Sequence, residues 1–105
     1  MTCSVTAPEI LCKQPSEDRQ FTMDFSNLLS GTEVINTIGS VSHELRGGGA
    51  SDLTVYNEVK NSDSTAVLFW VSGGTNNSTY RIEIVVTTSA GQTIEGDGLL
   101  SVRDE

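Results

Sequence analysis

The sequence is poor in positive charge, in long apolar runs and in histidine. Its 105 residues include six Lys and Arg against fourteen Asp and Glu, so the formal net charge is −8. Nucleic-acid binding depends on clustered Lys and Arg that contact phosphates, and the six basic residues form no cluster. No apolar run approaches the roughly 20 residues that span a bilayer. We therefore expect neither a nucleic-acid partner nor a membrane partner.

A single histidine limits the catalytic sites that the chain can build. A Ser-His-Asp or Cys-His site could form only around His43, and no nearby serine or cysteine has the sequence context of an activated nucleophile. A weak candidate for a calcium-binding site is formed by Asp24, Glu95 and Asp97. Solvated surface charge is their expected role, because Ca²⁺ needs about six or more oxygen ligands. We expect a protein that is not an enzyme and that holds no metal and no cofactor.

Only two cysteines are present, Cys3 and Cys12. A disulfide between them would close a loop of about ten residues and stabilise the fold by about 2–3 kcal/mol. The first residues show neither the positive segment nor the apolar segment of a secretory signal. We expect the protein to stay in the cytoplasm of the cell that makes it, or to leave by a route without a signal. Free thiols are the expected state in a reducing cytoplasm, and two cysteines without a nearby histidine are a poor zinc site.

The chain does have repeated alternation of apolar and polar residues. Phe21, Met23 and Phe25 alternate with polar neighbours, which is the period of a half-buried strand. Turns rich in Gly, Asn and Ser separate such segments, and no segment has the helical period. The expected strands cover residues 17–25, 33–38 with a short continuation at 41–45, 53–59, 66–71, 79–88 and 93–102. The pattern predicts an all-β fold, an immunoglobulin-like antiparallel β-sandwich of about seven strands, with a partial barrel as the alternative.

The length allows one domain, because about a hundred residues is the usual size of a single core. We expect residues 1–16 to form an extended lead-in and residues 17–105 to form the sandwich. Residues 26–31 should form a compact turn or one helical turn. The strand from residue 33 should end at Gly39, and Gly96 and Gly98 should mark a bulge.

Several side chains have expected places in this fold. Phe69 and Trp70 are neighbours on opposite faces of one strand, so at least one lies in the core and the other is free to face a partner. Tyr80 opens a long strand, where its hydroxyl can bond back across the strand corner. The predicted core residues are Phe21, Phe25, Leu68, Ile82, Ile84 and Val86.

Four segments of the sequence are distinctive: residues 71–75 (VSGGT), residues 80–82 (YRI), residues 86–93 (VTTSAGQT) and residues 23–35 (MDFSNLLSGTEVI). Together they resemble a family of small immunoglobulin-like structural proteins of tailed-bacteriophage virions. The resemblance covers roughly residues 17–103. It implies a virion protein, made and assembled in the host cytoplasm, that docks on other particle proteins, and it supplies no catalytic residues.

Within a virion, decoration or cementing of the head shell is slightly favoured over a neck, tail or fibre position. The expected partners are the major capsid protein or neck and tail proteins, and self-association stays open. The alternative is an immunoglobulin-like binding module of a bacterial adhesin or surface protein.

Docking is expected to use loops and the lead-in, because a thin Ser- and Thr-rich sandwich has little free apolar surface. The alternative for Ile10 and Leu11 is that both complete the first strand. The docking candidates are Ile10, Leu11, Arg46, Gly47, Gly48 and Gly49.

Overall fold

The computed structural model describes residues 3–104, which form eight strands and one short 3₁₀ helix. The elements, in chain order, are β1 (Thr6–Ala7), β2 (Leu11–Lys13), β3 (Arg19–Asp24), the 3₁₀ helix (Ser26–Leu28), β4 (Ile35–Leu45), β5 (Leu53–Lys60), β6 (Ala66–Gly73), β7 (Ser78–Thr88) and β8 (Thr93–Val102). The helical turn that the sequence predicts after Phe25 is confirmed. Among the described residues, no helix has the length and apolar character needed to cross a membrane.

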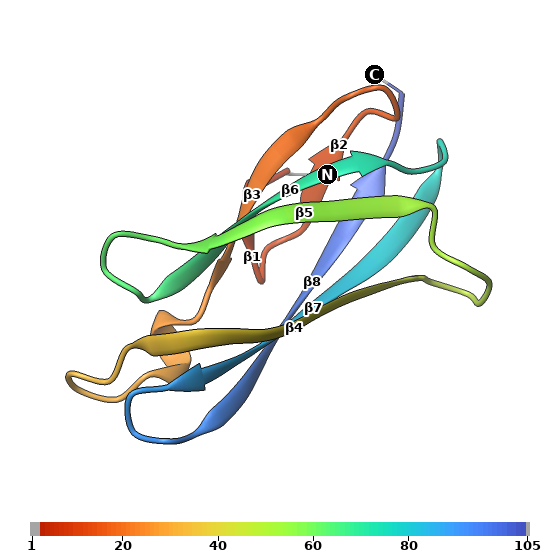
Figure 1. Ribbon diagram of the computed structural model, residues 1–105. Helices are drawn as coiled ribbons and strands as arrows, with labels where there is room; N and C mark the ends of the chain where they lie inside the picture. Colours follow the sequence, from red (N-terminus) through yellow and green to blue (C-terminus); the bar gives the residue numbers. More distant parts are fainter. Residues whose placement is uncertain (1–2, 105) are drawn as a thin grey trace.

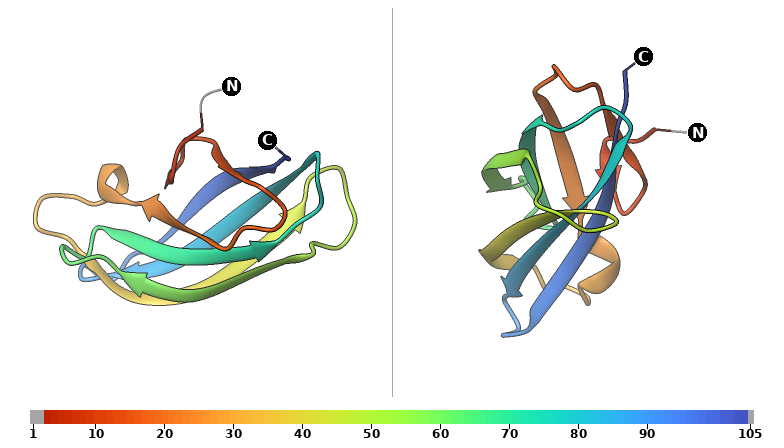
Figure 2. Two further views of the ribbon diagram at one scale, coloured as in Figure 1. Left: turned by 90° about the horizontal axis from the view of Figure 1, so that it is seen from above. Right: turned by 90° about the vertical axis from the view of Figure 1, so that its right-hand side faces the viewer.

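The strands form two four-stranded sheets that pack face to face (Figures 1 and 2). The first sheet has the order β1-β3-β6-β5, and the second has the order β2-β8-β7-β4. The predicted all-β sandwich is confirmed. The sheets are mixed rather than purely antiparallel, because β1 runs parallel to β3 and β2 runs parallel to β8. The described chain also has eight strands instead of about seven, since these two edge strands are too short to show an alternating pattern.

The first residues of the chain link the two sheets. β1 lies at the edge of the first sheet and β2 at the edge of the second, with a cis peptide bond between Ala7 and Pro8. Leu11 is completely buried in β2, in the other sheet from β3, and Ile10 lies outside the strands, so the alternative that both complete the first strand is not what the structure has. Cys3 and Cys12 form a disulfide, with their Cα atoms 5.4 Å apart, and the expectation of free thiols is therefore wrong. A parallel bridge between Ser4 and Leu11 places Cys12 within reach of Cys3.

The core lies between the sheets and is lined by one side of each long strand. Five of the six predicted core residues are buried: Phe21, Phe25, Ile82, Ile84 and Val86. Leu68 is only half-buried, and the prediction that it lies in the core is wrong. Val67, Phe69 and Val71 are fully buried, so the intervening Leu68 and Trp70 point to the outer face.

Glycines in β4 and β8 have different roles from those the sequence suggests. β4 continues through Gly39, with a register shift between Ile38 and Ser40, instead of ending there. β8 pairs with β7 in unbroken register through Gly96 and Gly98, so the predicted bulge is wrong. A Cβ at Gly96 would lie 2.9 Å from the Phe25 ring. Glycine is favoured there because the side chains of Phe25 and Met23 approach the β8 backbone closely.

Tyr80 forms the predicted bond across the strand corner. It is completely buried, and its hydroxyl accepts a 2.8 Å hydrogen bond from the Thr75 backbone N–H. The same hydroxyl donates to Asp52, which also accepts a hydrogen bond from the Thr75 side chain. These two hydroxyl donors hold the pKa of Asp52 below its usual range. The network joins the loop before β5 to the turn between β6 and β7.

Candidate docking surface

The predicted docking residues lie in two separate places. Ile10, between β1 and β2, is 41% exposed, whereas Leu11 is buried and cannot contact a partner. The glycine loop at residues 46–51 is exposed and joins β4 to β5. β1 and β2 lie at one edge of their sheets and β5 and β4 lie at the other edge, so the fold does not bring Ile10 and the glycine loop together. Gly47, Gly48 and Gly49 all have positive φ, which side chains adopt with strain.

His43 contacts a serine that the sequence pattern does not single out. Its Nδ1 lies 2.7 Å from Oγ of Ser51, at the far end of the glycine loop. The Ser51 hydroxyl also accepts a hydrogen bond from the Leu53 backbone N–H. These contacts attach the end of the loop to β4 and β5, and they give the His43–Ser51 pair a structural role.

Lys13 is a charged residue inside the fold, only 3% exposed. Its ammonium group donates to the backbone carbonyls of Gln14, Pro15 and Gly73, the last at 2.6 Å. Burial lowers the pKa of Lys13, and the nearby carboxylates of Glu17 and others oppose this change. The side chain therefore connects the N-terminal strands to the end of β6 and offers nothing to a partner.

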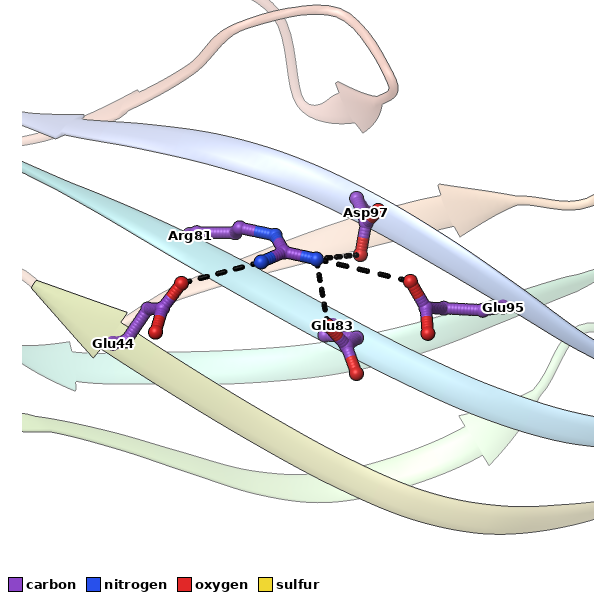
Figure 3. A network of polar contacts seen from close by, with 5 residues as sticks. All are labelled: Glu44, Arg81, Glu83, Glu95 and Asp97. Atoms are coloured by element: carbon purple, nitrogen blue, oxygen red, sulfur yellow. Dashed lines mark hydrogen bonds and ion pairs between the residues drawn. The ribbon is translucent and has the colours of Figure 1, made fainter. Parts of the chain in front are cut away.

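Arg81 lies among four carboxylates on the outer face of the second sheet (Figure 3). Its Nη1 lies 3.2 Å from Glu44, on the neighbouring β4. Its Nη2 lies 2.8 Å from Glu83 and 3.4 Å from Asp97. Glu95 is 3.8 Å from the same nitrogen. We call these five residues the acidic face, because four negative charges surround one positive charge.

The charges of the acidic face influence one another. The negative charge of Asp97 and the hydrogen bond to Glu44 raise the pKa of Arg81. Partial desolvation, followed by repulsion from Asp97 and Glu83, raises the pKa of Glu95. Carboxylate oxygens of Glu83, Glu95 and Asp97 lie within 4.8 Å of one another, with the Arg81 guanidinium beside them.

The calcium candidate proposed from the sequence is not assembled by the fold. Asp24 lies on β3, in the first sheet, whereas Glu95 and Asp97 lie on β8, in the second sheet. Asp24 points outward from its own sheet, as do the other two residues, so the three carboxylates do not share a site.

The outer face of the first sheet has the opposite chemistry. Tyr56 pairs directly with Trp70 across β5 and β6, and Val59 pairs with Leu68. Val59 is 51% exposed and the other three are half-buried. We call these four residues the apolar face. A register shift in β5 between Tyr56 and Val59 keeps both on the same side as their partners.

Sequence reasoning found only part of the apolar face. It identified Phe69 or Trp70 as free to face a partner, and the structure buries Phe69 completely. Tyr56 and Val59 were missed. They join Trp70 only through the β5–β6 register and the bulge, and a periodicity argument supplies neither of these.

Comparison with known proteins identifies the family. The family model described as the podophage GP4 fiber-tail adaptor protein gp77 matches residues 13–101, most of the chain. No curated protein and no solved structure matches the chain. The family match supports the predicted resemblance to virion proteins of tailed phages. It gives no support to decoration of the head shell, and it does not favour the adhesin alternative. The matched span contains β3 to β7, most of β8 and the last residue of β2, and the chain therefore belongs to the family of the podophage GP4 fiber-tail adaptor protein gp77.

Proposed function

We propose that the protein is a structural adaptor that joins a fibre to the tail of a podophage particle. The observation that carries this proposal is the family match over residues 13–101, which includes both outer faces of the sandwich. The partners are then tail and fibre proteins of the same virion, in place of the major capsid protein. Assembly takes place in the host cytoplasm, where the particle is built.

The shape and surface of the molecule support an adaptor role. The sandwich measures 41 × 25 × 22 Å, and its apolar face lies on the outer side of the first sheet, apart from the exposed loops at its edges. A protein that links two others needs two separate contact surfaces, and a rigid sandwich keeps them at a fixed distance. The exposed glycine loop and Ile10 remain additional docking candidates at the two edges.

The side-chain chemistry supports a protein that is not an enzyme. The one histidine is hydrogen-bonded to Ser51, Lys13 is enclosed by three carbonyls, and Asp52 accepts bonds from Tyr80 and Thr75. Each of these groups stabilises the fold locally. We propose no cofactor and no catalytic residue.

We also propose that the sandwich is immunoglobulin-like. If β1, β3, β4, β5, β6, β7 and β8 are matched in order to the seven strands of that fold, the first sheet reproduces the order A-B-E-D. The second sheet places β8, β7 and β4 in the order G-F-C, with β2 as an added edge strand. The bond from Thr75 to the Tyr80 hydroxyl resembles the tyrosine corner of such domains.

Mass spectrometry of purified particles, combined with removal of the gene, tests the adaptor function. We expect about a dozen copies or fewer per particle, as a closed ring at the tail allows, and particles made without the protein should retain tails but lack fibres. Hundreds of copies would indicate a shell protein. Complete absence from particles, or normal fibres without it, would contradict the proposal.

A further inference from the structure

The apolar face lies where a sheet that meets only water normally carries polar residues. β6 is an inner strand of its sheet, as β7 is of the other sheet. The outward residues of β7 include Arg81, Glu83, Val85 and Thr87, whereas those of β6 include Leu68, Trp70 and Ser72. Because the inner sides of both strands are fully buried, these outward residues are not needed to form the core. The apolar outer side of β6 is therefore available for contact with a partner.

We infer that the apolar face binds a different protein of the tail–fibre junction, whose contact surface is apolar at its centre and bordered by Lys or Arg side chains. This inference rests on the proposed function and names the surface and the partner chemistry. Trp and Tyr dominate the energetics of protein interfaces, because each buries a large area for few rotatable bonds. Tyr56 and Trp70 are held side by side by strand register, so little ordering is needed when they bind.

The charges around the apolar face indicate the partner's charge. Asp24 lies on the same outer side of the first sheet, in register with Ala66 at the end of β6. Asp63 lies in the turn between β5 and β6, at the same end as Val59 and Leu68. Basic border residues on the partner would complement these two carboxylates.

A second copy of this chain fits the apolar face poorly. The basic residues on the strands of this sheet, Arg19 on β3 and Lys60 on β5, have partners outside the apolar face. Arg19 lies 4.0 Å from Glu17, and the Lys60 ammonium donates to the Asn36 carbonyl on the edge of the other sheet. A copy would therefore offer further carboxylates to Asp24 and would also bring a formal charge of −8. The charge balance favours a different, basic partner.

Reconstitution on particles made without the protein tests which surface docks. Purified particles that lack the protein are mixed with added protein over a series of concentrations. The measured quantity is the amount of added protein that sediments with the particles. Leu68→Ser and Trp70→Ser should weaken binding by about tenfold or more, as loss of a central interface side chain does. Val85→Ser is the matched control, because Val85 is half-buried on the outer side of β7. This control should bind within about twofold of wild type.

Thermal unfolding of each variant separates binding from folding. Val59→Ser is a third variant of the apolar face, since Val59 is 51% exposed and its loss leaves the core intact. It should also weaken binding while the melting temperature stays unchanged. If the stably folded variants of the apolar face bind as well as wild type, the inference is wrong.

Charge substitutions at one exposed position test the partner's chemistry. Val59→Lys should weaken binding more than Val59→Glu, because a basic border repels Lys. The opposite order would contradict a basic partner.

Sedimentation of the free protein tests whether the apolar face binds a second copy, and we expect a monomer. A dimer that Trp70→Ser dissociates would assign the face to self-association and overturn the inference. If wild-type protein itself does not bind the particles, the proposed adaptor function fails; if wild type binds and the variants bind equally, only the assignment of the apolar face fails.

Discussion

The two outer faces of the sandwich differ more than their shared architecture requires. Both are built around an inner strand, β6 or β7, whose inner side is buried, and both extend onto the neighbouring edge strand. The second sheet surrounds Arg81 with four carboxylates, which keeps its surface hydrated. The first sheet instead presents Tyr56, Trp70 and their aliphatic neighbours. The acidic face is a solvated surface, whereas the apolar face is suited to contact.

The residues that stabilise the fold and the residues available for binding therefore lie on opposite sides of the strands. The buried residues come from both sheets and depend on the inner side of every long strand. The outer sides contribute little to that core, so their chemistry is free to serve another purpose. Variants on the inner and outer sides should therefore have separable effects, and the predictions below follow from the largest effect to the smallest.

The largest expected effect is on the inner side of β7. Ile84 is completely buried, and Ile84→Ala should lower the free energy of unfolding by about 2–5 kcal/mol, because it removes buried methyl groups and leaves a cavity. Val85→Ala, one residue along on the outer side, should change it by about 0.5 kcal/mol or less. Denaturant unfolding measures both. Equal losses of unfolding free energy in the two variants would show that the inner and outer sides of β7 contribute equally to stability.

A second effect tests how closely the sheets approach at β8. In Gly96→Ala the new Cβ would lie 2.9 Å from the Phe25 ring and 3.0 Å from Met23. The fold must shift to admit it, and we expect a loss of about 1–3 kcal/mol in chemical unfolding. An unchanged denaturant midpoint for Gly96→Ala would mean that the packing around Gly96 has room for a methyl group.

A third effect is a loss of stability in acid. Hydrogen bonds from Tyr80 and Thr75 lower the pKa of Asp52 in the folded state. Stability from this group is present above the unfolded-state pKa and is lost as the pH falls through the folded-state pKa. The melting temperature of wild type should therefore fall in acid more than that of Asp52→Asn. Parallel pH profiles for the two proteins would contradict this role.

The smallest effect is expected on the acidic face. Arg81→Gln leaves Glu44, Glu83, Glu95 and Asp97 without their shared cation, so the melting temperature should fall slightly. The fall should be greater at low salt, because salt screens repulsion between exposed carboxylates. Thr87→Ala, also on the outer side of β7, is the control and should show no salt-dependent difference. A salt-independent loss for Arg81→Gln would indicate packing instead of charge.

The parts of the fold that could be predicted are those with visible periodicity. β3, with Phe21 and Met23, and β7, with Ile82 and Ile84, alternate clearly, and both their positions and their buried sides are confirmed. β6 is a continuous apolar run, so the sequence could not show that Leu68 faces outward. β1 and β2 contain two and three residues, too few to show any period.

The surfaces could not be predicted because they depend on pairing between distant segments. Arg81 meets Glu44 and Asp97 only through the registers of β4, β7 and β8. Tyr56 meets Trp70 through the register of β5 and β6. Periodicity along one strand gives no information on register between strands.

Site-specific photo-cross-linking in assembled particles tests the central claim most directly. A photoreactive residue replaces Leu68 on the apolar face in one protein and Val85 on the outer side of β7 in another. After irradiation, mass spectrometry identifies the attached peptides. We predict that position 68 cross-links to a tail or fibre protein, at a segment rich in Lys or Arg, and that position 85 gives no cross-link to that segment. Cross-links from position 85 alone, or from position 68 to a second copy of this chain, would contradict the account.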